Sequence, residues 1–145
     1  MKLRKFTIND IKILKKYKYP DKSELEILKL IDEWNRGNAS GRYFEMFSIV
    51  NRDVLVGDLS LFEYEPACVS CAVEIFEPFK RNGYGSFAIN AGLELAKKRG
   101  YESAVAQVFK NNAEGLELFK NCGFFQVGEF INPHGHSVYT LKKYL

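Results

Sequence analysis

The stretch Lys80-Arg81-Asn82-Gly83-Tyr84-Gly85-Ser86 joins a strand-like segment to a long helical one. The first turn of a helix has free backbone N–H groups and the positive end of the helix dipole, and glycine lets an anion approach that backbone closely. Lys80 and Arg81 add positive charge, and Ser86 adds a hydroxyl group. The stretch therefore predicts a phosphate-binding turn. The alternative is an ordinary strand-to-helix turn, in which the glycines serve only the backbone angles.

The residues after this turn predict two helices and three strands. The first helix extends from about Gly83 to Arg99, because basic residues in its last turn and Gly100 after it mark a helix end. The elements that follow are a strand over Ser103–Phe109, a short helix over Asn112–Asn121 that Gly123 terminates, and two strands over Phe124–Ile131 and Ser137–Tyr144. Asn, Pro and Gly favour tight turns, so residues 132–135 are expected to join the last two strands.

The residues before the turn predict three further strands. Apolar and polar residues alternate in three segments that turn formers separate, which are Tyr43–Val50, Val54–Phe62 and Ala67–Phe76. Short turns join neighbouring strands in antiparallel order. We therefore expect these segments to form an antiparallel meander.

The N-terminal residues predict a short strand over Lys2–Ile8 and two helices. Asn9 and Asp10 are expected to cap the first helix, and Ser23 and Glu26 have the spacing of a capping box at the start of the second. The apolar residues of the second helix recur at helical spacing and are expected on its inner face; they are Leu25, Leu28, Ile31 and Trp34. The complete order of elements predicts an α/β fold, with one mixed sheet and helices against its faces.

The composition fits one soluble domain over residues 1–145. Of the 145 residues, 46% are hydrophobic and 27% are charged, which suffices for one sizeable core. The net charge of +3 is too small to indicate a nucleic-acid partner, and no apolar run has the length of a membrane span or signal peptide. Three cysteines do not make a disulfide framework, so we expect a reducing, cytoplasmic compartment.

The charges are distributed unevenly along the chain. Eight basic residues lie up to Lys22, whereas seven acidic residues and only one basic residue lie between Glu45 and Glu77. We interpret both stretches as solvated surface. The acidic stretch would also suit a cationic amine through electrostatic steering.

Gly83 to Ala88 also matches the G-x-G-x-x-A pattern of dinucleotide-binding proteins. That pattern belongs after the first strand of a parallel βαβ unit, with an acidic residue at the end of the next strand. Here the turn follows an antiparallel meander, and Glu102 lies at the start of the next strand. The context therefore argues against a nicotinamide-dependent oxidoreductase. The nucleotide-hydrolase motif G-x-x-x-x-G-K-[ST] does not occur in the sequence.

Two segments carry a resemblance to a known family. Lys80-Arg81-Asn82-Gly83-Tyr84-Gly85 is similar to the R/Q-x-x-G-x-G/A acetyl-coenzyme A loop of the GCN5-related N-acetyltransferases (GNAT), with Lys80 in place of arginine or glutamine. Residues 112–124, NAEGLELFKNCGF, are similar to that family's N-x-x-A-x-x-L-Y-x-x-x-G-F segment. The resemblance covers nearly the whole chain in element order. It implies a GNAT-like acyl-CoA N-acyltransferase fold, with a central, mostly antiparallel sheet flanked by helices.

The resemblance also implies where acetyl-coenzyme A (acetyl-CoA) binds. Its pyrophosphate is expected on the backbone amides of the loop, and its pantetheine arm in a cleft where the strand ending near Ile75 splays away from the strand over Ser103–Phe109. Backbone donors there would bind the thioester oxygen and stabilise the oxyanion. The expected coenzyme-binding residues are Ile75, Lys80, Arg81, Asn82, Gly83, Tyr84, Gly85, Ser86, Asn112 and Phe119.

Glu74 is the candidate general base, which would take a proton from the acceptor amine. It lies between Val73 and Ile75 in a strand, where a charged group is costly unless its face opens to a cleft or to solvent. A strand face that is simply exposed to solvent is the alternative interpretation. Glu77 is the second candidate for the base.

Phe119 marks a departure from the family pattern. It stands where the family often has a tyrosine that protonates the departing thiolate, and its ring has no proton to give. Solvent, Tyr84, Tyr139 or Cys122 would have to supply that proton. The thiolate of coenzyme A is also a fair leaving group without help, so we retain the prediction of an enzyme.

Cys68, Cys71, His134 and His136 form the one set that could suggest a zinc site. Residues three apart in a strand point to opposite faces, so the two cysteines are poorly placed to share an ion. We interpret the cysteines as small strand residues and expect no metal.

The sequence therefore predicts a single N-acetyltransferase domain that moves the acetyl group of acetyl-CoA directly to a primary amine, either a small amine or a peptide N-terminus. The alternative is a non-catalytic acyl-CoA-binding module, which Phe119 motivates. The expected partners are acetyl-CoA and the amine. We expect no nucleic acid and no membrane as partners, and a monomer or a homodimer.

Overall fold

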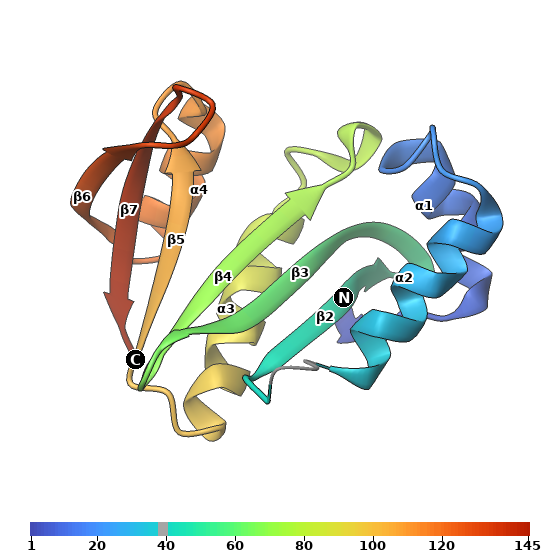
Figure 1. The fold of residues 1–145 in the computed structure, drawn as a ribbon, viewed down its shortest axis with the longest axis horizontal. Coiled ribbons are helices and arrows are strands. Elements are labelled where there is room, and N and C mark those ends of the chain that lie inside the picture. Colours follow the sequence, from blue (N-terminus) through green and yellow to red (C-terminus); the bar gives the residue numbers. More distant parts are fainter. Residues whose placement is uncertain (38–40) are drawn as a thin grey trace.

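A seven-stranded mixed sheet forms the centre of the molecule (Figure 1). The structure is a computed structural model that describes residues 1–37 and 41–145. In spatial order the strands are β1 (Lys2–Arg4), β2 (Phe44–Asn51), β3 (Val54–Glu65), β4 (Cys68–Ile75), β5 (Ser103–Phe109), β7 (Ser137–Tyr144) and β6 (Phe125–Ile131). All neighbouring strands are antiparallel except β4 and β5, which are parallel. The predicted mixed, mostly antiparallel sheet and its meander of β2, β3 and β4 are confirmed.

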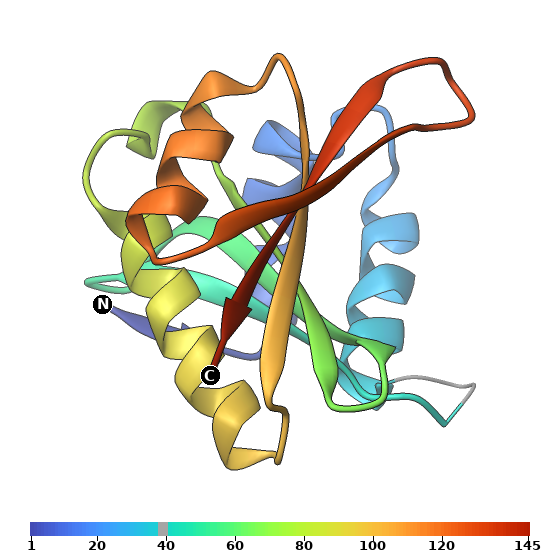
Figure 2. The same cartoon turned by 90° about the vertical axis from the view of Figure 1, so that its left-hand side faces the viewer.

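Helices cover both faces of this sheet (Figure 2). The helices are α1 (Ile11–Tyr17), α2 (Glu24–Arg36), α3 (Tyr84–Lys98) and α4 (Ala113–Asn121), with short 3-10 turns η1 (Ile8–Asp10) and η2 (Glu77–Phe79). The larger hydrophobic core packs α3 and α4 on one face, and a smaller core packs α1 and α2 on the other. Among the described residues, no helix is both long and apolar enough to cross a membrane.

The start of α2 confirms the predicted capping box, but its inner face differs from the prediction. The Ser23 hydroxyl accepts from the Glu26 backbone N–H at 3.1 Å, and the Glu26 carboxylate accepts from the Ser23 backbone N–H at 3.0 Å. Ile27 and Ile31 are buried, whereas Leu25 is 61% exposed. The prediction was right for Ile31 and wrong for Leu25, because Ile27, which is four residues before Ile31, faces the smaller core in its place.

The N-terminal strand is shorter than predicted and its helix cap lies earlier. β1 ends at Arg4, and Thr7 caps the 3-10 turn by accepting from the Asn9 backbone N–H at 3.3 Å. Asp10 is buried at the N-cap position of α1, but its side chain makes no cap bond to that helix. Its carboxylate instead accepts from the Thr7 backbone N–H at 2.9 Å, which completes a capping box on η1. The same carboxylate accepts from both terminal guanidinium nitrogens of Arg4, at 2.8 and 2.9 Å, in a charge-assisted pair.

The sheet opens between β4 and β5, as the resemblance implied. The two parallel strands pair only from Cys68 with Ser103 to Ser70 with Val105. Beyond these residues β4 and β5 are not paired, whereas β5 pairs with β7 along its whole length, and Figure 1 shows the two halves of the sheet diverging. The second half of β4 therefore offers backbone N–H and C=O groups to whatever lies in the opening.

Candidate active site

A cleft of about 560 Å³ lies where β4 ends, between the first turn of α3 and one side of α4. Of the residues expected to bind the coenzyme, those that line it are Ile75, Lys80, Arg81, Gly83, Tyr84, Gly85, Ser86 and Asn112. Glu74, the candidate base, lines the same cleft. The structure thus brings the glycine turn, the open strand and the candidate base together. Asn82 and Phe119 are absent from the lining among the described residues.

The glycine turn has the backbone geometry of an anion site. Gly83 precedes the first residue of α3 with φ 80° and ψ 4°, and Arg81 also has a positive φ of 64°. The first helical bond runs from the Phe87 N–H to the Gly83 oxygen at 3.1 Å. The N–H groups of the residues between them have no acceptor inside the helix, so they are available to a bound anion.

Asn82 supports the turn from within. Its side-chain amide donates to the Phe79 and Lys80 carbonyl oxygens at 3.0 and 3.1 Å. The side chain therefore fixes the path of the loop. The backbone N–H of Asn82, rather than its side chain, is the group that the expected coenzyme site would use.

The two cations of the turn pair with nearby acidic side chains. Arg81 meets Glu114 of α4 at 3.1 Å, and Lys80 meets Glu77 at 3.0 Å. Three of these four side chains are more than half exposed, and the fourth, Lys80, is 37% exposed. Exposed ion pairs contribute little to stability, so both cations can exchange a carboxylate for a phosphate at low cost.

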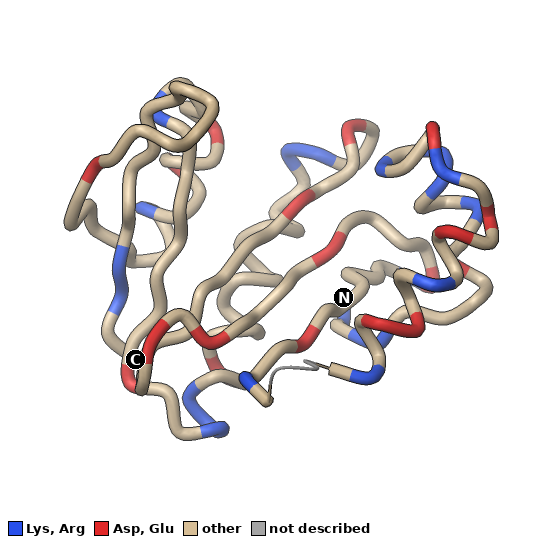
Figure 3. Tube along the Cα trace, viewed as in Figure 1, with Lys and Arg blue, Asp and Glu red and all other residues tan. Residues whose placement is uncertain are grey.

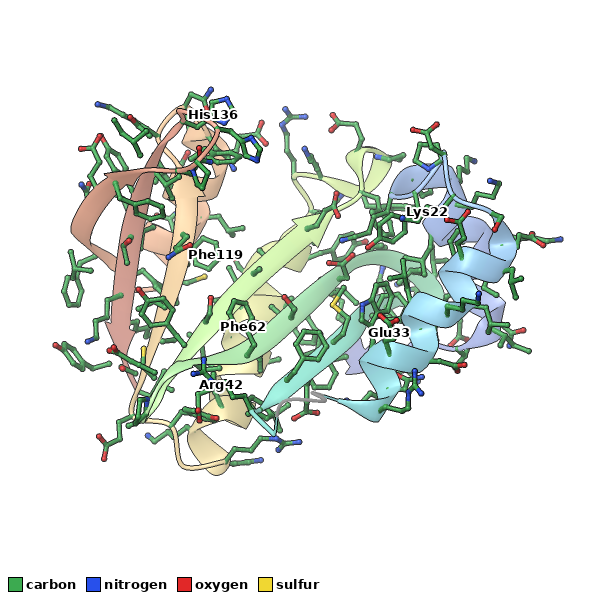
Figure 4. The ribbon with its side chains drawn as sticks, in the orientation of Figure 1. Lys22, Glu33, Arg42, Phe62, Phe119 and His136 are labelled. Atoms are coloured by element: carbon green, nitrogen blue, oxygen red, sulfur yellow. The ribbon has the colours of Figure 1, made fainter. Side chains whose placement is uncertain are left out.

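The family-like segment on α4 has a structural role at both ends. Asn112 caps the helix, since its side-chain oxygen accepts from the Gly115 backbone N–H at 2.9 Å. Phe119 is 5% exposed and its ring packs edge-on against Phe124, with ring centroids 5.1 Å apart. Figure 4 shows Phe119 in the interior of the molecule. Because the Phe119 ring packs in the core, it does not reach the lining of the cleft.

The three alternative acids for the thiolate lie in different places. Tyr84 lines the cleft, and its hydroxyl accepts from the Asn51 side-chain amide at 2.9 Å, which leaves its own proton free to donate. Cys122 is buried at the end of α4, and Tyr139 is half-buried on β7. The position of Tyr84 keeps it as a candidate.

Glu74 takes part in an ion-pair cluster that the sequence did not indicate. The Lys18 ammonium donates to the Glu74 carboxylate and to the Asp58 carboxylate, both at 2.7 Å. Asp58 is opposite Glu74 in the register of β3 and β4, and it is 4% exposed. A signal for it was present, because Asp58 is the one charged residue in the apolar run from Val54 to Phe62.

Burial controls the charges of this cluster. Burial raises the pKa of Asp58 to about 6, although the Lys18 ammonium opposes this rise. Burial alone would lower the pKa of Lys18, but the two carboxylates outweigh it and raise that pKa above its ordinary value. A carboxylate pKa close to neutral pH is a property of groups that exchange protons in active sites.

The acidic stretch from Glu45 to Glu77 is less exposed than we predicted. Figure 3 shows acidic residues along the central strands, with basic residues on the segments around them. Glu45 is buried and pairs with Arg99 and Lys5, and Asp58 is buried against Lys18. The interpretation as solvated surface was wrong for these two residues. Steering by this stretch is weakened accordingly, because their charges are already neutralised.

The cysteines and histidines are spread over separate places. Cys68, Cys71 and Cys122 are free and buried, and burial raises the pKa of Cys71 to about 12. His136 lies at the tip of the C-terminal hairpin, edge-on to Phe109 (Figure 4). Within residues 1–37 and 41–145, no group of three or more His, Cys, Asp or Glu is arranged to hold a metal ion.

The comparisons with known proteins identify the family of this chain. The chain belongs to the acetyltransferase (GNAT) family, whose model matches residues 8–124. The protein is therefore an acyltransferase with the acyl-CoA N-acyltransferase fold, and its family uses acetyl-CoA. No curated protein matches its sequence.

Three solved structures illustrate the similarity of the fold. A spermidine N-acetyltransferase chimera from Vibrio cholerae and hSSAT is 18% identical with a TM-score of 0.81, covering 99% of this chain and 96% of that one. A ribosomal-protein-alanine N-acetyltransferase from Brucella melitensis is 17% identical with a TM-score of 0.79, covering 100% of both chains. A ribosomal L7/L12 α-N-protein acetyltransferase in complex with coenzyme A is 17% identical with a TM-score of 0.85, covering 99% and 93%.

Proposed function

We propose that this acyltransferase moves the acetyl group of acetyl-CoA directly to a primary amine, either a small amine or a peptide N-terminus. The observation that carries the proposal is the meeting of the glycine turn and Glu74 in one cleft at the open end of β4. The backbone N–H groups of the glycine turn suit the phosphates of acetyl-CoA, and the Glu74 carboxylate suits the ammonium of the acceptor amine. The neighbours named above act, by their names, on spermidine or on ribosomal proteins, which are both amine acceptors.

Each part of the cleft has a chemical task in this reaction. The free N–H groups at the start of α3, with Lys80 and Arg81, bind the pyrophosphate. The open backbone edge of β4 aligns the pantetheine arm and donates to the thioester oxygen, which stabilises the oxyanion as the amine attacks. Glu74 takes the proton that the ammonium must lose before attack, directly or through a water molecule. The tetrahedral intermediate then collapses and expels the thiolate, which takes up a proton from Tyr84 or from solvent, while the attacking nitrogen releases its remaining extra proton to solvent.

An acetyl-transfer assay tests this proposal. The protein is incubated with acetyl-CoA and, separately, with spermidine, other small amines and peptides with free N-termini. Mass spectrometry identifies the acetylated product, and a thiol reagent measures the release of coenzyme A. We expect thiol release in step with one acetylated amine. Binding of acetyl-CoA with no transfer to any acceptor would favour the alternative of a non-catalytic acyl-CoA-binding module.

Gly83→Ala is expected to weaken the binding of coenzyme A about tenfold, equivalent to about 1.4 kcal/mol. Its φ of 80° strains any other residue, and the added methyl group stands at the turn that the phosphates must approach. Isothermal calorimetry of each variant with coenzyme A measures the effect. Gly135→Ala is the matched control, since Gly135 has φ 82°, open surroundings and a place in the β6–β7 turn. Equal affinities of the two variants would contradict a phosphate role for the turn.

A cytoplasmic location remains a prediction from the sequence. It rests on three cysteines that are all free in the structure, which suits a reducing compartment. The expected absence of nucleic-acid and membrane partners, and a monomeric or homodimeric state, are proposals of the same kind.

A further inference from the structure

Lys18 connects two strands of the sheet at the edge of the cleft. It directly follows α1, and its ammonium lies 2.7 Å from an oxygen of Asp58 on β3 and 2.7 Å from an oxygen of Glu74 on β4. The Lys18 side chain is only 18% exposed, so the cluster is partly withdrawn from solvent. A single cation is thus shared by two carboxylates from neighbouring strands.

The two carboxylates are held close by the sheet itself. Asp58 and Glu74 are direct partners in the β3–β4 register, so their side chains leave the sheet on the same face. Asp58 is almost fully buried, whereas Glu74 is 48% exposed and lines the cleft. Tyr19 is a further titratable group beside the two carboxylates, and burial raises the pKa of its hydroxyl. On the other side of Asp58, its partner on β2 is Ser48, whose hydroxyl donates to the Arg4 carbonyl oxygen.

We infer that Lys18 is a positioning residue for proton transfer, which holds the Glu74 carboxylate oriented at the cleft by tying it to the neighbouring, buried Asp58. This inference rests on the proposed function, in which Glu74 accepts the proton of the acceptor amine. Asp58 then acts as the fixed end of the cluster, because it is buried and cannot follow Glu74 into solvent. Through its two ion pairs, Lys18 holds the exposed Glu74 carboxylate next to the buried Asp58.

The physical reason is the repulsion between two carboxylates in one place. The shared ammonium of Lys18 offsets this repulsion and joins both carboxylates in one geometry. Without that cation, the buried Asp58 is the carboxylate that keeps a proton, because burial already raises its pKa to about 6. Glu74 then loses the partner that holds it at the cleft. The loss of Lys18 should therefore lower acetyl transfer without affecting the coenzyme turn.

The test compares kcat/KM for one amine acceptor, and the Kd of coenzyme A, in the wild type, Lys18→Met, Lys18→Arg and Lys16→Met. In Lys18→Met we expect kcat/KM to fall about tenfold, because Glu74 is no longer held in place, while the Kd of coenzyme A stays at the wild-type value. Lys18→Arg keeps a cation that can bridge the two carboxylates and should restore most of kcat/KM. Lys16→Met is the matched control, since Lys16 is an exposed lysine of α1. An unchanged kcat/KM in Lys18→Met would overturn the inference.

Asp58→Asn gives an independent result. It removes the charge at the buried end that anchors Lys18, so kcat/KM should fall as in Lys18→Met while the Kd of coenzyme A stays at the wild-type value. This variant tests the inference if Lys18→Met does not fold, and a wild-type kcat/KM in Asp58→Asn would overturn it.

The wild-type protein separates this inference from the proposed function. A wild type that is stabilised by acetyl-CoA but acetylates no amine would end both proposals. An active wild type with an unchanged kcat/KM in Lys18→Met would end only the role of Lys18.

Discussion

Replacement of Glu74 by Gln is expected to lower kcat/KM for acetyl transfer by about 10²–10⁴ at neutral pH. Gln keeps the size of the side chain and removes the group that accepts the proton of the amine. The loss should shrink at high pH, where the amine deprotonates without help. A pH series of kcat/KM with one amine acceptor measures both effects.

Glu77→Gln is the control for this experiment. Glu77 was the second candidate for the base, and the structure places it in η2, where its carboxylate pairs with Lys80. We expect this variant to retain a wild-type pH profile. The role of Glu74 would be refuted by a loss that is the same at every pH, or by a larger loss in Glu77→Gln.

Replacement of Gly57 by Ala is expected to lower the melting temperature by about 5–10 °C. A Cβ atom at this position of β3 would lie 2.2 Å from the Glu74 carbonyl oxygen and 3.0 Å from the Ile75 Cα atom. Both are backbone atoms of β4, so neither can rotate away. The strands must separate where β4 forms the wall of the cleft, and acetyl transfer should fall as well. Thermal unfolding, together with the transfer assay, measures the change.

Gly128→Ala is the matched control on β6. A Cβ atom at Gly128 would meet nothing within 4 Å, and its φ is not in the positive range. We expect its melting temperature to stay close to that of the wild type. Similar melting temperatures for the two variants would mean that β3 and β4 are not held as closely as the structure shows.

Local patterns in the sequence were sufficient for much of the fold. The capping box of Ser23 and Glu26 and the limits of β5 depend on residues close together in the chain, and they were predicted correctly. Leu25 was misplaced because α2 carries two apolar stripes, and only packing against the sheet selects one of them. The insertion of β7 between β5 and β6 was beyond the sequence, since strand order is a long-range property.

The candidate site was also predicted only where its geometry depends on residues that are close together in the sequence. The glycine turn binds through backbone groups whose geometry is encoded locally, so Gly83 and its neighbours could be recognised from their spacing. Lys18 and Asp58 are 40 residues apart in the sequence, and only the folded sheet brings them to Glu74. A buried aspartate in an apolar strand is a signal in itself, but its partner cannot be deduced without the structure.

The most direct test of an acetyl-CoA-dependent enzyme is thermal unfolding of the wild-type protein with acetyl-CoA, desulfo-coenzyme A and NAD added separately. A ligand at 100 times its Kd stabilises the native state by about 2.7 kcal/mol. We expect a rise in melting temperature with both coenzyme A compounds and none with NAD. No rise with either coenzyme A compound, or a rise with NAD alone, would contradict the assignment of the cleft.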